Sequence, residues 1–151
     1  VKIAYYEKNH EKYFEANVNL IEWLRGYSEI KEESFVRGFL GRMLFSGEES
    51  LKKVNVLSGG EKVRCMFSKI KKKKGNVLLL DEPTNHLDVA TKKVMAKSLN
   101  DYGGTLLIVS HDLEFLKHLG IERMLMLPSG RLQFFDENIV KRYMEKEKQQ
   151  R

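Results

Sequence analysis

Apolar residues occur at two kinds of spacing along this chain, and each spacing predicts a type of secondary structure. Two short runs, at residues 76–80 and 105–110, are almost entirely apolar. Such runs are typical of strands that lie inside a parallel sheet, because helices then cover both faces. Spacings of three and four residues elsewhere indicate amphipathic helices. The alternation of the two patterns predicts an α/β fold with a parallel sheet.

Helical spacing dominates the first third of the chain. Val18, Ile21 and Leu24 share one face of a helix expected from Asn17 onward. Residues 32–45 repeat the pattern, with Phe35, Phe39 and Met43 at steps of four beside Val36 and Leu40. Residues 1–6 carry β-forming side chains and predict a short strand.

A further helix is predicted after Ser58, and its start has a recognisable cap. Ser58 and Glu61 have the spacing of a capping box, in which each side chain bonds the other residue's backbone N–H. An apolar stripe follows, and Gly75 is a suitable end for the helix. The stripe consists of Val63, Met66, Phe67 and Ile70.

The rest of the chain continues the strand and helix alternation. Helices are predicted at residues 89–100, at 112–119 and, with many charges and few core positions, at 137–151. Residues 123–135 contain two β-rich segments around a Pro-Ser-Gly turn, which predicts a hairpin.

Composition narrows the class of protein. The 151 residues are 42% hydrophobic and 32% charged, as expected for one globular domain with a real core. The single cysteine, Cys65, excludes an intrachain disulfide. No apolar run approaches the roughly 20 residues that cross a bilayer, and the first residues lack the apolar core of a signal peptide. We therefore expect no membrane partner and a cytoplasmic location.

Two adjacent acids, Asp81 and Glu82, follow the first buried strand. Ligands of α/β folds bind at the carboxyl ends of the strands, where an acid reaches a phosphate-bound Mg²⁺ and a neighbouring acid polarises water. The alternative is a pair of acids favoured by the dipole of a following helix. His111 follows the second strand in the corresponding position. A lone histidine there can equally be a partly buried imidazole with a structural role only.

Three short motifs decide between these interpretations. They are LSGGE at 57–61, LLLDEPTNHLD at 78–88 and SHD at 110–112, in that order. Together they resemble the nucleotide-binding domain of an ATP-binding cassette (ABC) protein, and the EPTNHLD wording is similar to the ABC-F branch. The resemblance extends over essentially the whole chain. It implies part of a P-loop NTPase core with parallel strands and a helical signature subdomain.

The resemblance implies a role for each motif residue. Glu82 would be the general base, His111 the switch histidine that contacts the γ-phosphate, and Asp81 the acid linked to Mg²⁺. Asp88 would belong to a loop that crosses a cassette dimer interface. The signature turn, which would hold the γ-phosphate of ATP on an opposite cassette, consists of Ser58, Gly59, Gly60 and Glu61.

Two departures from the family pattern concern the phosphates and the metal. Residues 1–151 contain no G-x-x-x-x-G-K-[ST] loop, so nothing in this sequence cradles the α- and β-phosphates. Lys8 stands where the family has a glutamine that binds the metal, and an ammonium has no acceptor and would repel Mg²⁺. ATP and Mg²⁺ are therefore expected in the complete family domain, and bound weakly or not at all by this chain alone.

We interpret the chain as the C-terminal portion of one ABC-F-type cassette. Residues 10–75 would form the signature subdomain, 76–136 the Walker B half of the core and 137–151 a charged helix. The parent would be a ribosome-associated ATPase. The alternative is a non-catalytic half-domain that acts as a scaffold, or as a piece completed in trans by a Walker A half. Expected partners are a second cassette or that missing half, with self-association as a further alternative.

The basic character of the chain admits several partners. The formal net charge is +6, which is compatible either with ribosomal RNA or with a merely solvated surface. The lysines cluster once, at residues 71–74. Three interpretations stay open for this cluster: a solvated helix end, a surface made soluble because its covering element is absent, and a contact with ribosomal RNA.

Overall fold

Three parallel strands form the centre of the computed structural model, which describes residues 1–72 and 75–149. The other described elements are a separate two-stranded hairpin, six α-helices and short 3₁₀ turns. The strands and helices, in chain order, are β1 (Ile3–Tyr6), α1 (Leu20–Gly26), α2 (Glu33–Arg42), α3 (Gly59–Lys72), β2 (Val77–Asp81), α4 (Val89–Asn100), β3 (Thr105–Val109), α5 (Leu113–His118), β4 (Arg123–Met126), β5 (Arg131–Phe134) and α6 (Glu137–Gln149), with short 3₁₀ turns at Glu11–Phe14, Glu49–Leu51 and Val54–Val56.

The sheet has the order β1-β2-β3, and both pairings are parallel. Tyr6 pairs with Leu80, and Asp81 pairs with Val109. All three strands therefore end at the same edge of the sheet, and the segments that follow β2 and β3 leave it side by side. The predicted α/β fold with a parallel sheet is confirmed.

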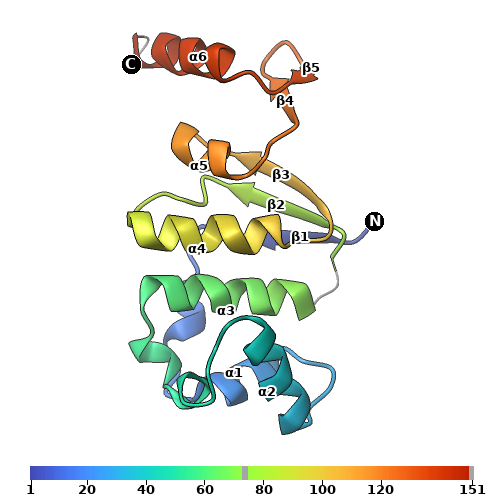
Figure 1. Ribbon diagram of the computed structural model, residues 1–151, viewed down its shortest axis with the longest axis vertical. Coiled ribbons are helices and arrows are strands. Elements are labelled where there is room, and N and C mark those ends of the chain that lie inside the picture. Colours follow the sequence, from blue (N-terminus) through green and yellow to red (C-terminus); the bar gives the residue numbers. More distant parts are fainter. Residues whose placement is uncertain (73–74, 150–151) are drawn as a thin grey trace.

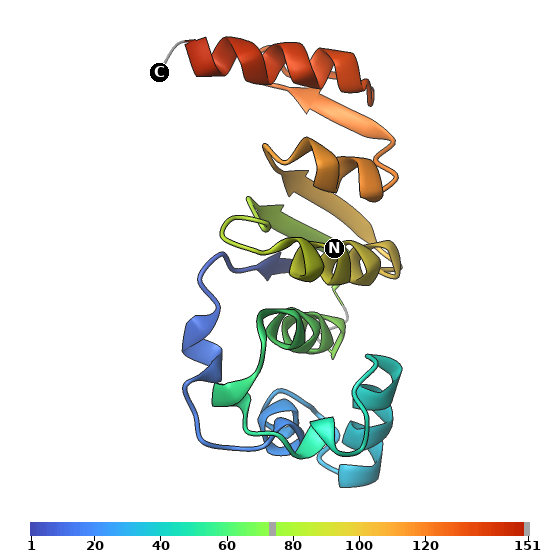
Figure 2. The ribbon, with the colours of Figure 1, turned by 60° about the vertical axis from the view of Figure 1, so that its left-hand side comes forward.

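The elements are stacked in layers along the longest axis (Figure 1). Helices α1 and α2 form one end, followed by α3, then α4 against the sheet, then α5, and finally the hairpin and α6. In the rotated view, α3 is seen nearly end-on between α4 and the α1–α2 layer (Figure 2). Because it lies between two layers, α3 buries side chains on both of its sides.

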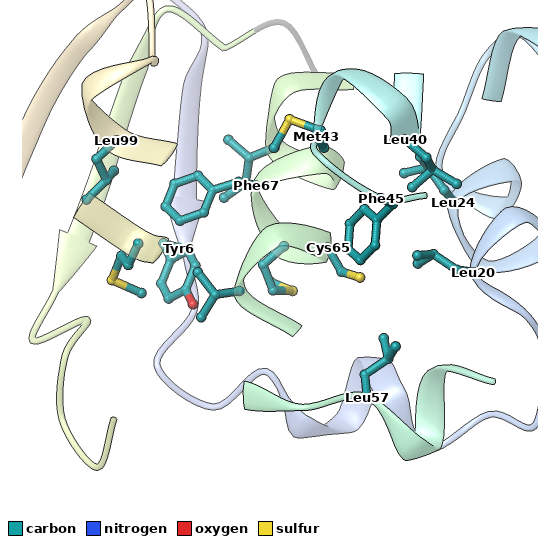
Figure 3. Packing of buried hydrophobic residues seen from close by; sticks show 14 of the residues in the cluster. Tyr6, Leu20, Leu24, Leu40, Met43, Phe45, Leu57, Cys65, Phe67 and Leu99 are labelled. Carbon is teal, nitrogen blue, oxygen red and sulfur yellow. The ribbon is translucent and has the colours of Figure 1, made fainter. Parts of the chain in front are cut away.

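The core follows from this position of α3. The predicted stripe of Val63, Met66, Phe67 and Ile70 is buried. Phe67 stacks on Tyr6 of β1, with ring centroids 5.4 Å apart. On the other side of α3, Cys65 lies toward Leu20, Leu24, Leu40 and Phe45 of the helical layer (Figure 3). One continuous cluster thus joins the sheet to the helical layer.

The expectation that the apolar strands are buried on both faces is wrong. Leu78 and Leu80 of β2 are buried, but Leu107 and Val109 of β3 are 55% and 53% exposed. On β1, Ile3 and Tyr5 are exposed as well. The reason is that α3 and α4 cover one side of the sheet, and no described helix covers the other. We call this second side, with Ile3, Tyr5, Leu107 and Val109, the uncovered face.

Helix boundaries differ from the predicted ones where local capping decides them. Helix α1 begins at Leu20 and not at Asn17, because the side chain of Asn19 accepts a hydrogen bond from Glu22 N–H and caps the helix. Helix α2 ends at Arg42, before the predicted residue 45, because Leu44 takes a left-handed conformation with φ 65°. This conformation is typical of the residue that stops a helix.

The C-terminal part agrees with the pattern. Strands β4 and β5 form the predicted hairpin, which closes where Gly130 N–H donates to Met126 O at 2.8 Å. Helix α6 has no fully buried residue, as its charged sequence predicts. Gly75, near the predicted end of the helix, lies outside α3, whose last described residue is Lys72. The lysines at 73 and 74 and the last two residues of the predicted C-terminal helix lie outside the described residues.

Candidate functional site

The carboxyl ends of β2 and β3 bring the first candidate residues together. Asp81 is the last residue of β2 and is exposed, and Glu82 follows it directly. The backbone N–H of Glu82 donates to Val109 O at 2.8 Å, which fixes the turn to the end of β3. Two residues beyond Val109 the chain reaches His111. The parallel pairing therefore places Glu82 and His111 beside each other, although 29 positions separate them in the sequence.

The backbone at Glu82 is unusual. Its φ angle is 46°, in the left-handed region that residues with a side chain rarely adopt. His86, in the same turn, has φ 64°. Asp88 ends the turn and caps α4, because its Oδ1 accepts from Thr91 N–H at 2.7 Å and this hydrogen bond lowers the pKa of the carboxyl. Strained positions of this kind concentrate at functional sites and persist because the surrounding structure enforces them.

Glu82 and His111 form a direct pair. One carboxylate oxygen of Glu82 contacts Nδ1 of His111, and the other accepts from the backbone N–H of His111 at 3.3 Å. The Glu82 side chain is only 16% exposed, whereas that of His111 is 54% exposed. The hydrogen bond that His111 makes to Glu82 raises the pKa of the imidazole, and its hydrogen bond to Glu147 adds a smaller increase. The pair holds the imidazole in one orientation and favours its protonated form.

A third carboxylate reaches this pair from the end of the chain. Glu147 of α6 lies 2.9 Å from Nε2 of His111, measured to Oε2. Both nitrogens of the imidazole therefore have a carboxylate partner. The group borders a cavity of about 460 Å³ whose other lining residues are Asn85, Met144 and Lys148.

The signature turn is built as predicted. Ser58 N–H donates to Glu61 Oε2 at 2.7 Å, and Glu61 N–H donates to Ser58 Oγ at 3.3 Å, which confirms the capping box. A Cβ atom at Gly59 would lie 3.2 Å from the hydroxyl oxygen of Thr91, so a glycine suits this close approach. The turn thus packs against the start of α4.

The structure does not bring the signature turn to the Glu82–His111 pair. Ser58, Gly60 and Glu61 line a different cavity, of about 390 Å³, between α3, α4 and the end of α2. Lys8 is exposed in the segment after β1 and lines neither cavity.

Sequence reasoning missed two ion pairs around the site. Lys92 of α4 donates to Asp112 Oδ2 at 2.6 Å, and Asp112 also caps α5 by accepting from Phe115 N–H. Although burial opposes it, the Lys92 ammonium and this cap hold the pKa of Asp112 below its usual value. The cap could have been predicted, because an aspartate directly before a helix is a common N-cap. The contact of Glu147 with His111 could not be predicted from a local pattern, because the two residues lie 36 positions apart.

Magnesium would depend on ligands from outside the protein. Within residues 1–72 and 75–149, no three His, Cys, Asp or Glu side chains lie together as a metal site. Mg²⁺ is commonly held by one or two carboxylates, with waters and substrate phosphates completing its shell. The exposed Asp81 suits such a shared site but does not form a resident one.

Comparisons with known proteins agree on one class of protein, the ATP-binding cassette proteins. The fold is that of an ATP-binding cassette: a solved dimeric cassette, MJ0796, described as a post-hydrolysis state bound to ADP and Pi, superposes with a TM-score of 0.61. It is 20% identical, and the match covers 89% of this chain and 63% of that one. No family model matches the sequence. Among the described helices, none has the length and apolarity needed to cross a membrane.

Relatives identify the family. An uncharacterized ABC transporter ATP-binding protein, YkpA of Bacillus subtilis (strain 168), is 50% identical over 84% of this chain and 24% of its own length. ABC transporter F family member 5 of Arabidopsis thaliana is 35% identical over 85% of this chain and 18% of its own length. The chain belongs to the ATP-binding cassette proteins of the ABC-F type. It spans about a quarter or less of the length of the curated relatives it matches.

Proposed function

We propose that this chain is the C-terminal portion of an ABC-F nucleotide-binding domain, and that the parent hydrolyses ATP at a cassette dimer interface. The observation that carries the proposal is the Glu82–His111 pair at the carboxyl ends of two parallel strands. In this arrangement the Glu82 carboxylate accepts the proton of an attacking water. His111 presents its other nitrogen, Nε2, to the γ-phosphate.

The other candidate residues complete the proposed site. Asp81 would reach Mg²⁺ through water, and a bound Mg²⁺ neutralises phosphate charge as the γ-phosphoryl group transfers. Ser58, Gly59 and Gly60 present N–H groups and a hydroxyl at the start of α3, an arrangement that suits a phosphate of a second cassette's ATP. Asp88 would approach that second cassette from the start of α4.

A loop that binds the α- and β-phosphates is absent from residues 1–151. Without a G-x-x-x-x-G-K-[ST] loop, this chain alone is expected to bind MgATP weakly at most and not to hydrolyse it. The uncovered face supplies a place for a Walker A half, since exposed apolar side chains on a sheet favour a covering layer. The parent's partners would then be a second cassette and, through the basic surface, ribosomal RNA in the cytoplasm.

A non-catalytic scaffold is the second candidate function. The observation in its favour is the same uncovered face, since apolar side chains bind a protein partner without any nucleotide. ATP dependence distinguishes the two candidates.

Mixing the chain with the Walker A half of the Bacillus subtilis relative tests the proposal. We expect MgATP to promote association, measured by sedimentation velocity. Leu107→Lys on the uncovered face should abolish the association, whereas Leu51→Lys should not, since Leu51 is equally exposed but lies in the helical layer. Association that is the same without nucleotide would favour the scaffold, and no association with that half would contradict the assembly of a Walker A half on the uncovered face.

A further inference from the structure

Helix α6 presents one side of itself to the candidate site. Val140, Met144 and Glu147 follow each other at steps of four and three, so they lie on one helix face, and all are partly buried. Met144 and Glu147 line the same cavity as Glu82 and His111. The contact of Glu147 with His111 therefore belongs to a helix face that is directed at the site.

Two further contacts hold this helix in place. At its first turn, Glu137 forms an ion pair of 2.8 Å with Lys117 of α5. At its middle, the Tyr143 hydroxyl donates to Leu127 O in the hairpin. Both anchors involve residues that precede the last turn of α6, so neither of them holds that turn at the site.

The contact made by Glu147 uses the atom that the proposed function assigns to phosphate. Each N–H of an imidazole donates one strong hydrogen bond, and Nδ1 is held by Glu82. Glu147 occupies Nε2 at 2.9 Å. A phosphate oxygen that bonds Nε2 must replace Glu147. The phosphate and the Glu147 carboxylate are both negative, so they also repel each other when both lie near His111.

We propose that α6 is an autoinhibitory gate, in which the Glu147 carboxylate occupies His111 in place of the γ-phosphate until nucleotide displaces it. This inference rests on the proposed function and adds a regulation of the same site. Nucleotide binding and release of the last turn of α6 are then coupled, and the coupling is reciprocal. Lys148, which lines the same cavity, leaves the site together with Glu147.

The size of the effect follows from the exposure of the pair. His111 and Glu147 have side chains 54% and 41% exposed, and exposed ion pairs are worth about 1 kcal/mol or less. Occupation of the site by Glu147 therefore weakens nucleotide binding by about fivefold at most.

The test compares the whole chain with Glu147→Gln and with Glu145→Gln. Glu145 is an exposed residue of the same helix that does not line the cavity, so its replacement makes the same charge change elsewhere. MgATP is titrated to high millimolar concentration while NMR follows the His111 imidazole signal, assigned with His111→Gln. Hydrogen exchange reports the last turn of α6 in parallel.

The gate predicts that Glu147→Gln binds MgATP up to about fivefold more tightly than the other two proteins. It also predicts faster exchange in the last turn of α6, in this variant without nucleotide and in the other two when MgATP binds. Equal affinities, with the His111 signal shifting in all three, would overturn the gate and leave the proposed function standing. No shift of His111 in any protein up to high millimolar MgATP would also overturn the gate, because the gate requires nucleotide to reach Nε2 of this chain, and it would leave the proposed function standing, since that function assigns the grip on the other phosphates to a further segment.

Discussion

A single hydroxyl group in the core stands out at the residue scale. Tyr6 is 1% exposed, and its hydroxyl has no hydrogen-bond partner among the described residues. Burial raises the pKa of this hydroxyl. Its ring, by contrast, is well placed, because it stacks on Phe67. The ring therefore stabilises the contact of β1 with α3, while the oxygen atom opposes burial.

Tyr6→Phe should accordingly stabilise the protein. Removing an unpaired buried hydroxyl recovers its desolvation cost, so we expect the free energy of unfolding to rise by about 1 kcal/mol. The matched control is Tyr102→Phe, because the Tyr102 hydroxyl donates to Gly75 O at 2.7 Å and its loss should cost about 1 kcal/mol. Urea unfolding measures both. Equal destabilisation by the two changes would show that Tyr6 has a partner.

Residue-level patterns predicted some side-chain contacts and missed others. The capping box and the meeting of Glu82 with His111 could be predicted, because each follows from a local motif or from parallel strands ending together. Glu147 could not be assigned to the site, because its position depends on how the hairpin directs α6. Lys69 could not be placed either: it is buried on α3 with its ammonium 3.3 Å from the centre of the Tyr13 ring.

At the scale of elements, α3 shows most clearly how predicted and observed burial differ. A single apolar stripe was predicted for it, whereas the helix lies between two layers and buries additional side chains. Ser68 and Lys69 interrupt the apolar pattern outside this stripe, yet both are buried. The strands show the opposite difference: their apolar runs predicted two covered faces, and the described chain covers one.

The start of α3 gives a prediction with a pH dependence. Glu61 accepts from Ser58 N–H and from Lys52 Nζ, each at 2.7 Å. Burial opposes ionisation, but these two donors outweigh it and lower the pKa of Glu61. A lowered pKa in the folded state means that ionised Glu61 stabilises the fold above the unfolded pKa of about 4.5. This stabilisation is lost as pH falls through the folded pKa.

Glu61→Ala should therefore cost about 1–2 kcal/mol near neutral pH, and Glu61→Gln less, because glutamine can still cap Ser58. Urea unfolding at several pH values measures both. The difference between wild type and Glu61→Gln should shrink as the pH falls below about 4.5. Glu29→Ala, an exposed change elsewhere, is the control and should have little effect. A cost for Glu61→Gln that is independent of pH would contradict a role for the charge.

At the scale of the whole molecule, the candidate site and the uncovered face belong to the same three-stranded sheet. The acids and the histidine meet at one edge of the sheet, the signature turn faces another cavity, and the uncovered face displays Leu107 and Val109. On the function proposed above, one additional segment would supply both the phosphate-binding loop and the cover of the sheet. The motifs predicted that the acids and the histidine belong together, but periodicity alone could not reveal that one side of the sheet is uncovered in the described residues.

Steady-state hydrolysis of MgATP by the purified chain, with no second chain added, tests this account most directly. The account predicts a rate no higher than that of Glu82→Gln, since Glu82 and His111 act only on phosphates that another segment holds. Mg²⁺-dependent turnover by the chain alone, abolished by Glu82→Gln, would contradict it.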